Sequence, residues 1–322
     1  MKVPDVAVTY KWPTIDFSRL GWAFTLAAAI VLWLIACAIS GHLVINLLFD
    51  NLILGSFVAL VGVGQMVVIA SGDGAFDLSI PYVMTLAAFV CAAVSGAQGK
   101  NLAVGILAGL GTGLVAGIFN GVLVTGPGLP PIVATLATGY IAYTVVLLMG
   151  TQLVVAPSLT RFAQQSWHGL TMVIVVAIVI WTVVALVRGQ TPYGLHLHAM
   201  GQSRAAAALA AVRVKTMAIS TFVISGFLAA IAGILLSGYV GGIYADMATT
   251  YLIGSVAAVV VGGTSVRGGE SAIAATIFGA ITVTLLTTVL ELSGAGPGLQ
   301  DIGEGAVIII VVTVAAQAQT AR

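Results

Sequence analysis

The strongest constraint on the fold is a series of long apolar segments that contain almost no charged residue. The first of them, GWAFTLAAAIVLWLIACAIS at 21–40, has no Asp, Glu, Lys or Arg. A helix of about 20 apolar residues crosses the hydrocarbon core of a bilayer. Backbone groups in that core must be hydrogen-bonded within the segment itself, so each segment is expected to be helical.

The distribution of apolar residues predicts an all-α polytopic membrane protein with about ten transmembrane helices. Some of these segments are interrupted by glycine, and we expect them to be broken helices. The expected spans are 21–40, 50–70, 80–97, 102–124, 131–150, 170–188, 216–238, 250–263, 271–291 and 302–318.

Composition excludes the common soluble classes. Apolar residues make up 60% and charged residues 7% of the chain, against about 45–50% and about 25% in ordinary globular proteins. A soluble enzyme, a disordered protein and a secreted disulfide scaffold are therefore excluded. A net charge of +1 gives no sign of nucleic-acid binding. Cys37 and Cys91 both lie in apolar runs, and they predict neither a disulfide framework nor a metal site.

The distribution of Lys and Arg predicts the orientation. With a cytoplasmic N-terminus, only Lys100 and Arg161 of the 11 basic residues fall on the far side of the membrane. This asymmetry follows the positive-inside rule and places both termini in the cytoplasm. The expected parts are a leader at 1–20, a transmembrane domain at 21–318 with a long cytoplasmic loop at 189–215, and a tail at 319–322.

Glycine recurs in two informative patterns. A stripe at four-residue spacing places small residues on one helix face, which predicts close helix packing; its members are Gly105, Gly109, Gly113, Gly117 and Gly121. Segments 55–74 and 254–272 both run from Gly-Ser through apolar residues to a Gly-rich polar break. Their likeness is interpreted as a pair of inverted repeats, as in many transporters.

The segment SGDGAFDLS at 71–79 places two carboxylates between two apolar runs. Asp77, followed by Ser79 and Pro81, is suited to capping the next helix. The alternative is ion or proton binding by the Asp73 and Asp77 pair. Gly72 allows the chain to turn at this point.

The loop at 191–216 has a strong helix-forming centre at 202–214. It predicts a short helix across the cytoplasmic ends of the spans, with one face on the membrane domain and the other offered to a protein partner. An interfacial helix on lipid headgroups is the alternative, although an Ala-rich face inserts poorly. His196 and His198 do not have metal-ligand spacing, and we expect them to pack within the loop.

The segment VGGTSVRGGESA at 261–272 contains four glycines that flank Arg267. A phosphate-binding P-loop needs a Gly-Lys-Ser/Thr step after a strand, and neither is present. The segment is therefore interpreted as a break or tight turn and not as a nucleotide site; its glycines are Gly262, Gly263, Gly268 and Gly269.

These three segments occur in an order and spacing that resemble permease subunits of ABC importers of the ribose, xylose and autoinducer-2 class. The resemblance covers about 52–312. It implies a second permease subunit, identical or homologous, two copies of a cytoplasmic ATPase domain and an extracytoplasmic solute-binding protein, at a bacterial inner membrane. No cofactor is then expected in this chain, because ATP and Mg would belong to the ATPase.

By the same resemblance, 199–214 is the coupling helix that docks in a groove of the ATPase. Its expected docking residues are Ala199, Gly201, Arg204, Ala205, Ala206, Leu209 and Val212. The chain departs from the family pattern at Ala75-Phe76, at 80–82 and at 202–204. These departures put the familiar substrates in doubt.

The expected function is a transport subunit, not an enzyme, that forms the path for a sugar or a similar small polar solute. Rare polar residues in or near the spans are candidates for that path, with interhelical hydrogen bonding as the alternative: Gln65, Asn120 and Gln152. Residues in external loops would contact the delivery protein or anchor the interface: Trp167, Tyr244 and Asp246. Two other functions stay open, namely a permease for branched-chain amino acids and a proton-coupled transporter that uses Asp73 and Asp77.

Overall fold

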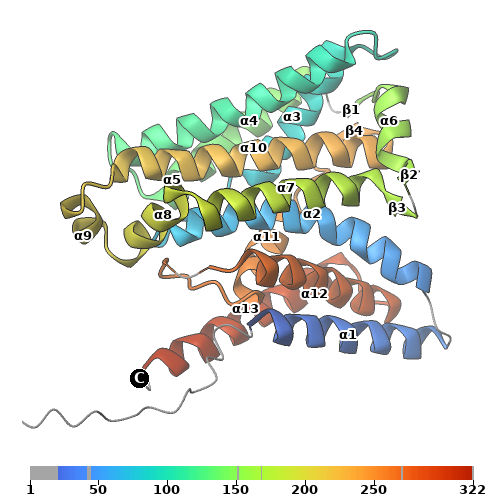
Figure 1. Cartoon of the computed structure of the whole chain (residues 1–322). Helices are drawn as coiled ribbons and strands as arrows, with labels where there is room; N and C mark the ends of the chain where they lie inside the picture. The colour runs from blue at the N-terminus through green and yellow to red at the C-terminus, as the bar shows by residue number, and fades with distance from the viewer. Residues whose placement is uncertain (1–20, 42–44, 151, 168, 270, 321–322) are drawn as a thin grey trace, which may run out of the picture.

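The computed structural model describes residues 21–41, 45–150, 152–167, 169–269 and 271–320, which form a helical bundle (Figure 1). The first half contains α1 (Gly21–Ser40), α2 (Ile45–Ala70), α3 (Ile80–Ser95), α4 (Leu102–Thr125), α5 (Pro131–Met149), β1 (Gln152–Leu153) and α6 (Pro157–Gln164). The second half contains β2 (Ser166–Trp167), β3 (Leu170–Thr171), α7 (Met172–Gln190), α8 (Pro192–Gln202), α9 (Arg204–Leu209), α10 (Val214–Val240), β4 (Ile243–Tyr244), α11 (Tyr251–Val261), α12 (Ile273–Leu292) and α13 (Pro297–Thr320).

Every predicted apolar segment contains a helix, which confirms the all-α polytopic fold. Seven helices of the described chain are long and apolar enough to cross a membrane, namely α1, α2, α4, α5, α7, α10 and α12. Helices α3 and α11 are apolar but shorter. The count of ten spans therefore stays a prediction. The predicted leader at 1–20 lies outside the described residues.

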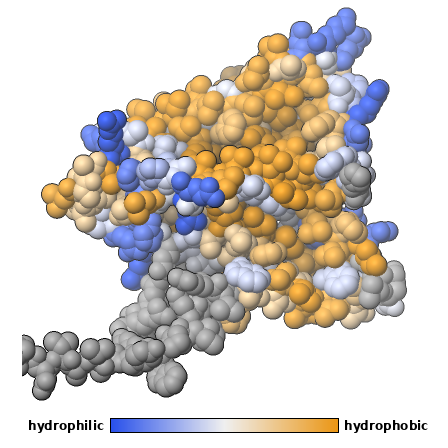
Figure 2. Space-filling model, viewed as in Figure 1, coloured by the Kyte–Doolittle hydropathy of each residue, from blue (hydrophilic) through white to orange (hydrophobic). Residues whose placement is uncertain are grey.

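The bundle has two polar ends separated by an apolar belt (Figure 2). At one end, called the α6 end, lie α6 and the antiparallel strand pairs β1–β4 and β2–β3 (Figure 1). At the other end, called the α8 end, lie α8 and α9. Lys100 and Arg161 lie at the α6 end, whereas Arg188, Arg204 and Arg267 lie at the α8 end. The predicted separation of basic residues is thus present among the described residues.

Helices α2 and α10 form the centre of the bundle and run antiparallel. The rings of Phe57 and Tyr239 are 5.9 Å apart near one end of the pair. Further along, Gly64 allows close approach, because a methyl group added there would lie 3.1 Å from Cα of Ser225. Their contact faces are fully buried, as at Phe57, Leu60 and Met66. These two helices therefore carry the apolar core on which the shorter segments pack.

The predicted glycine stripe is a packing surface of α4. A methyl group added at Gly113 would lie 2.3 Å from the carbonyl oxygen of Gly226 in α10. One added at Gly117 would lie 2.4 Å from the carbonyl oxygen of Phe222. Real Cβ atoms do not approach an oxygen so closely, so the two helix backbones touch only because these positions lack side chains. The predicted packing role is confirmed.

We expect Gly113→Ala to lower the stability of the purified protein while Gly111→Ala leaves it unchanged. The first change inserts a methyl group against the α10 backbone and forces the helices apart, at a cost of about 1–3 kcal/mol. Gly111 lies on the same helix with open space around its Cα. Thermal unfolding in detergent measures the difference. Equal midpoints for the two variants would contradict this account of the α4–α10 contact.

The prediction that 55–74 and 254–272 are inverted repeats is wrong. Gly254 approaches Val58, and Gly62 approaches Ala258, so the two segments run parallel. Both end at the α8 end, where the backbone N–H of Gly269 donates to the carbonyl of Ala70 (3.0 Å). The sequence likeness reflects the glycine and small aliphatic residues that any closely packed span contains.

A pattern of a long helix, a break and a short helix nevertheless occurs twice in opposite directions. Helix α2 of 26 residues ends at the α8 end and precedes the 16-residue α3. Helix α10 of 27 residues ends at the α6 end and precedes the 11-residue α11. Each polar end of the bundle therefore contains one break after a central helix.

Candidate functional site

The break between α2 and α3 depends on left-handed backbone. Gly72 has φ of 83°, Asp73 of 56° and Gly74 of 62°. Glycine adopts this region at no steric cost, and Asp is among the few other residues that tolerate it. The run of three such residues stops α2 and turns the chain back toward the interior of the bundle. Ala75 and Asp77 are consequently buried.

Asp77 is the centre of a buried polar network. It is 1% exposed, and its Oδ2 accepts a hydrogen bond from Oγ of Ser225 in α10 (2.6 Å). Its Oδ1 accepts from both Oγ (2.5 Å) and N (3.0 Å) of Ser79. The backbone N–H of Asp77 donates to Oε1 of Gln65 in α2 (3.1 Å). One carboxylate thus holds the break against two central helices.

The network extends to α4 and α5. Nδ2 of Asn120 donates to Oγ of Ser79 (2.9 Å), and the backbone N–H of Leu78 donates to Oγ1 of Thr135 (3.1 Å). We call Gln65, Asp77, Ser79, Asn120 and Ser225 the Asp77 network. A polar group buried in a membrane domain is stable only when it is hydrogen-bonded, so this network fixes where α3 begins.

The predicted capping role of Asp77 is met only in part, because no side-chain capping bond is formed at the start of α3. Ser79 is the N-cap residue of α3, and Asp77 accepts its backbone N–H rather than one inside the helix. Pro81 lies in the first turn, as expected. Asp73 makes different contacts: its side chain is 64% exposed and its Oδ2 lies 2.8 Å from Nε of Arg204. The structure does not bring the two carboxylates together as a pair.

The predicted path residues lie in different places. Gln65 and Asn120 are 0% and 1% exposed and belong to the Asp77 network. Gln152 lies in β1 at the α6 end, where it pairs with Tyr244 of β4. In this conformation Gln65 and Asn120 contact other protein groups, which is the interhelical alternative. A role in the solute path stays a prediction for all three residues.

The predicted single helix at 199–214 is wrong in its extent, because two helices occupy the loop. Helix α8 ends at Gln202, Ser203 is extended, and α9 covers only Arg204–Leu209. Oγ of Ser203 accepts the backbone N–H of Ala206 (3.3 Å), so this serine caps the second helix. The Ala-rich composition predicted a continuous helix, but the capping hydroxyl of Ser203 favours a new start.

Three glycine-containing segments meet at the α8 end. A methyl group added at Gly201 would lie 2.1 Å from the carbonyl oxygen of Ala70 and 2.3 Å from N of Gly269. One added at Gly268 would lie 2.4 Å from Cα of Gly72. We call Gly72, Gly201, Gly268 and Gly269 the glycine junction. It joins the loop at 189–215 to the break after α2 and to the break after α11.

Polar contacts surround the glycine junction. Nδ1 of His198 donates to the carbonyl of Gly269 (2.8 Å), so this exposed histidine contacts another segment instead of packing within its own loop. The guanidinium of Arg188 in α7 donates to the carbonyl of Ser271. The ion pair of Asp73 with Arg204 links the first break to α9. Consequently α9 is bonded to the break after α2, and α7 and α8 are bonded to the break after α11.

The predicted docking residues divide into two groups. Ala205, Ala206 and Leu209 of α9 are exposed, with Leu209 91% exposed. The others are partly covered by the membrane domain: Ala199, Gly201, Arg204 and Val212. The two other predicted break glycines lie beside the junction. Gly262 packs on the backbone of Ala275 in α12, and Gly263 has φ of 77° with open space around it.

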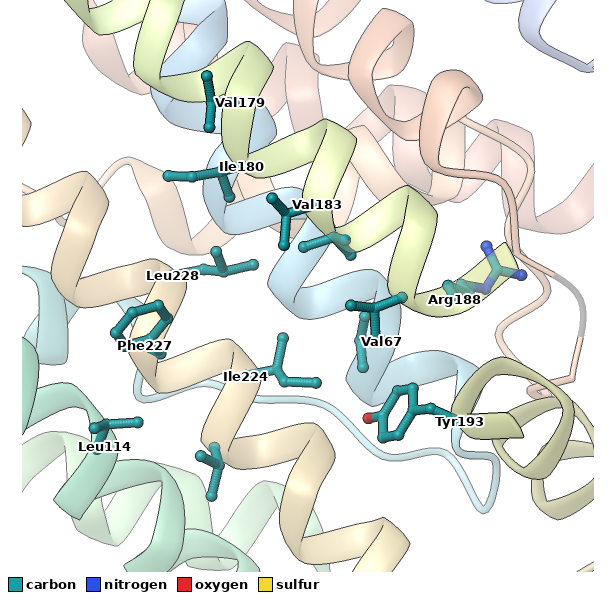
Figure 3. A pocket seen from close by; sticks show the side chains of 13 residues that line it. Val67, Leu114, Val179, Ile180, Val183, Arg188, Tyr193, Ile224, Phe227 and Leu228 are labelled. Carbon is teal, nitrogen blue, oxygen red and sulfur yellow. The ribbon is translucent and has the colours of Figure 1, made fainter. Parts of the chain in front are cut away.

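A groove of about 380 Å³ lies between α7 and α10 (Figure 3). Its walls are almost entirely aliphatic, with Arg188 and Tyr193 toward the α8 end. Burial raises the pKa of the Tyr193 phenol, which keeps it neutral, and Ser220 donates to its oxygen (3.2 Å). The groove offers no polar groups for a hydrophilic solute along its length.

A smaller cavity of about 200 Å³ has polar walls that sequence reasoning missed. It lies between α2, α11, α12 and α13, and its polar residues are Thr250, Tyr251, Thr284, Thr287, Gln300, Asp301 and Glu304. Oγ1 of Thr287 donates to Oε1 of Glu304 (2.8 Å). The pair of acidic residues in an otherwise apolar last span was the available signal. In the described residues no three His, Cys, Asp or Glu side chains form a metal-ligating group.

The chain matches known permease proteins over most of its length. Residues 47–312 match the protein family described as branched-chain amino acid transport system / permease component. The galactofuranose transporter permease protein YtfT of Escherichia coli (strain K12) is 31% identical over 321 residues, which cover 96% of this chain and 91% of that protein.

Two further relatives also match most of this chain. The fructose import permease protein FrcC of Rhizobium meliloti is 29% identical over 80% of this chain and 74% of its own length. The autoinducer 2 import system permease protein LsrD of Photorhabdus laumondii is 27% identical over 91% of each chain. No solved structure gives a significant match.

Proposed function

The chain belongs to the family of branched-chain amino acid transport system permease components, and from this membership we propose that it forms the membrane path of an ATP-driven importer for a sugar or a similar small polyhydroxyl solute. The family match confirms the resemblance found in the sequence. A permease component is a transport subunit and not an enzyme. It contributes two membrane conformations whose populations are shifted by its partners.

The solute class is inferred from relatives and from charge. The similar proteins are named for galactofuranose, fructose and autoinducer 2. A branched-chain amino acid carries both an ammonium and a carboxylate, and it needs charged groups or helix ends in its path. Only 7% of this chain is charged, which favours a neutral solute.

The glycine junction is the observation that carries the proposed mechanism. Backbone contacts at Gly201 tie α8 to the end of α2 at Ala70 and to Gly269 in the break after α11, so a displacement of α8 would move both of these breaks. Packed interfaces of this kind switch between discrete arrangements and do not deform gradually. ATPase closure against α9 would therefore move the break after α2 and the break after α11 together.

The proposed partners follow from this arrangement. Two copies of a cytoplasmic ATPase domain would dock at the α8 end, where ATP and Mg would bind to those domains and not to this chain. A second permease subunit would complete the path. An extracytoplasmic binding protein would deliver solute at the α6 end. In this orientation the α8 end and both termini lie on the cytoplasmic side of a bacterial inner membrane.

In this mechanism the Asp77 network would hold the start of α3 in place against the neighbouring helices. It joins the first break to four helices through hydrogen bonds in a low-dielectric interior, where such bonds are strong. The junction at the helix ends would move relative to this anchor. In this proposal Asp77 has a structural role.

We expect Ala206→Trp or Arg204→Glu to abolish ATP-dependent uptake without preventing membrane insertion. Ala206 is exposed on α9, so a large side chain would block docking without disturbing the core. Arg204→Glu places like charges together at Asp73. Uptake by the assembled importer in proteoliposomes measures the effect.

The matched control is Ala185→Trp, the same change at an exposed alanine of α7. It should leave uptake intact, because it lies among the exposed aliphatic side chains of α7 and belongs neither to α9 nor to the α6 end. If both α9 variants take up solute at the normal rate, α9 is not the docking surface.

A further inference from the structure

Three tyrosines and one aspartate form a cluster near the break after α10. The ring of Tyr82 in α3 lies 5.8 Å from the rings of both Tyr140 and Tyr143 in α5. The hydroxyl of Tyr143 donates to Oδ1 of Asp246 (3.0 Å), in the turn between β4 and α11. We call these four residues the tyrosine–aspartate cluster. No role was assigned to the three tyrosines on the basis of sequence.

The depth of the cluster is unusual for these side chains. Tyr143 lies six residues before the end of α5 at Met149, and Tyr140 lies nine residues before it. At 1.5 Å per residue these positions are about 9 and about 14 Å inside the helix end. Tyrosine otherwise concentrates at the membrane interface. Tyr140, which is 60% exposed, thus presents a phenol near the middle of a candidate span.

Asp246 is exposed as well, although its hydrogen-bond partner Tyr143 belongs to the span formed by α5. An ionisable side chain that faces hydrocarbon is costly, and such residues therefore face a bundle interior or a water-filled cavity. Tyr82 contacts both Tyr140 and Tyr143 and so joins this carboxylate to Tyr140, and we take the exposed face of Tyr140 to line the same water-filled surface as Asp246. Oγ1 of Thr249, in the same turn, donates to the carbonyl of Asp246 (3.1 Å).

Helix α7 shows what a lipid-facing surface of this chain looks like. Its exposed large side chains are all aliphatic, namely Ile178, Val179, Val183, Leu186 and Val187. Val179 is 57% exposed, close to the value for Tyr140. The surface of α7 and the surface around Tyr140 are therefore similarly exposed, but the first is aliphatic and the second carries phenol and carboxylate groups.

We infer that the tyrosine–aspartate cluster contacts the solute on its way through the membrane, with a sugar ring against the exposed tyrosine face and its hydroxyls donating to Asp246. This inference rests on the proposed function. Aromatic faces bind the apolar face of a sugar ring. A carboxylate accepts charge-assisted hydrogen bonds from hydroxyls and binds them without requiring a charged solute.

Gly139 positions this cluster. A methyl group added at Gly139 would lie 2.6 Å from Cδ2 of Tyr82, so the missing side chain leaves room for the ring of Tyr82 against α5. The tyrosines come from two helices and the carboxylate from a turn more than 100 residues later. The break after α10 is what brings Asp246 to them.

Cysteine labelling tests whether the cluster faces water. In a variant with Cys37→Ser and Cys91→Ala, Tyr140→Cys should react with a charged, membrane-impermeant thiol reagent in proteoliposomes. Val179→Cys is the control. Val179 is 57% exposed, close to the 60% of Tyr140, and it lies seven residues after the first residue of α7, which is at the α6 end. Equal protection of both cysteines would overturn the inference.

Uptake measurements test solute contact. We expect Asp246→Asn and Tyr140→Ala to reduce uptake of radiolabelled galactose or fructose about tenfold or more, while ATP hydrolysis stimulated by the loaded binding protein is retained. Ile141→Ala, at the adjacent position with 55% exposure, should leave uptake unchanged.

The outcomes separate the two proposals. If the wild-type assembly takes up either sugar and the cluster variants match it, the inference is overturned and the proposed function stands. If the wild-type assembly takes up neither sugar with ATP, the proposed sugar import is overturned, and the assignment of a sugar to the cluster is overturned with it.

Discussion

Replacing Gly201 with alanine is expected to abolish ATP-driven uptake, although the change adds a single methyl group. That methyl would lie 2.1 Å from the carbonyl oxygen of Ala70 and 2.3 Å from N of Gly269. Both neighbours are backbone atoms and cannot rotate away. Helix α8 must therefore shift away from the two breaks, which separates the proposed coupling segment from the parts that it moves.

Three measurements distinguish this effect from misfolding. The Gly201→Ala protein should reach the membrane and bind the ATPase, because the exposed residues of α9 are untouched. ATP hydrolysis should continue but lose its stimulation by the loaded binding protein, and uptake should fall more than about tenfold. Gly189→Ala is the control, since Gly189 lies at the same end with open space around it. Normal uptake by Gly201→Ala would show that the junction does not transmit motion.

Replacing Asp77 with alanine is expected to have the largest effect on stability. The change removes the acceptor for Oγ of Ser225 and for both N and Oγ of Ser79. Each buried donor left without a partner costs about 1–3 kcal/mol. The free energy of unfolding should therefore fall by about 3 kcal/mol or more, measured by denaturation in detergent.

The conservative change Asp77→Asn separates structure from proton transfer. Asparagine keeps an acceptor oxygen and the shape of the side chain, so uptake should be largely retained if Asp77 only anchors the break. In a proton-coupled transporter the same change would abolish uptake, and transport would require a proton gradient instead of ATP. Asp73→Asn should change stability by less than about 1 kcal/mol, because the Asp73 side chain is 64% exposed and water screens its ion pair.

Much of the fold was predictable because the bilayer restricts what an apolar segment can do. Each apolar run became a helix, and the four-residue glycine stripe became the contact of α4 with α10. Local chemistry was also predictable at Asp77, whose position before Ser79 and Pro81 favoured a cap. These features depend on residues that are close together in the chain.

Features that depend on distant residues were missed or misjudged. The likeness of 55–74 to 254–272 suggested inverted repeats, whereas the two segments lie parallel with Gly62 beside Ala258. The Ala-rich loop suggested one helix, yet Ser203 divides it into α8 and α9. The tyrosine–aspartate cluster gave no signal, because Tyr82, Tyr143 and Asp246 are distant in sequence.

The sequence by itself determined that this chain is a bundle of membrane helices with one long loop at 189–215 and Gly-rich breaks. Apolar length, charge placement and glycine spacing act locally, and the bilayer makes their consequences nearly unique. Only the tertiary structure decided that Gly72, Gly201 and Gly268 meet at one point and that Asp77 anchors the first break to α10. Which backbones touch depends on helix packing across the whole bundle, where a missing Cβ matters only if another segment arrives at the same place.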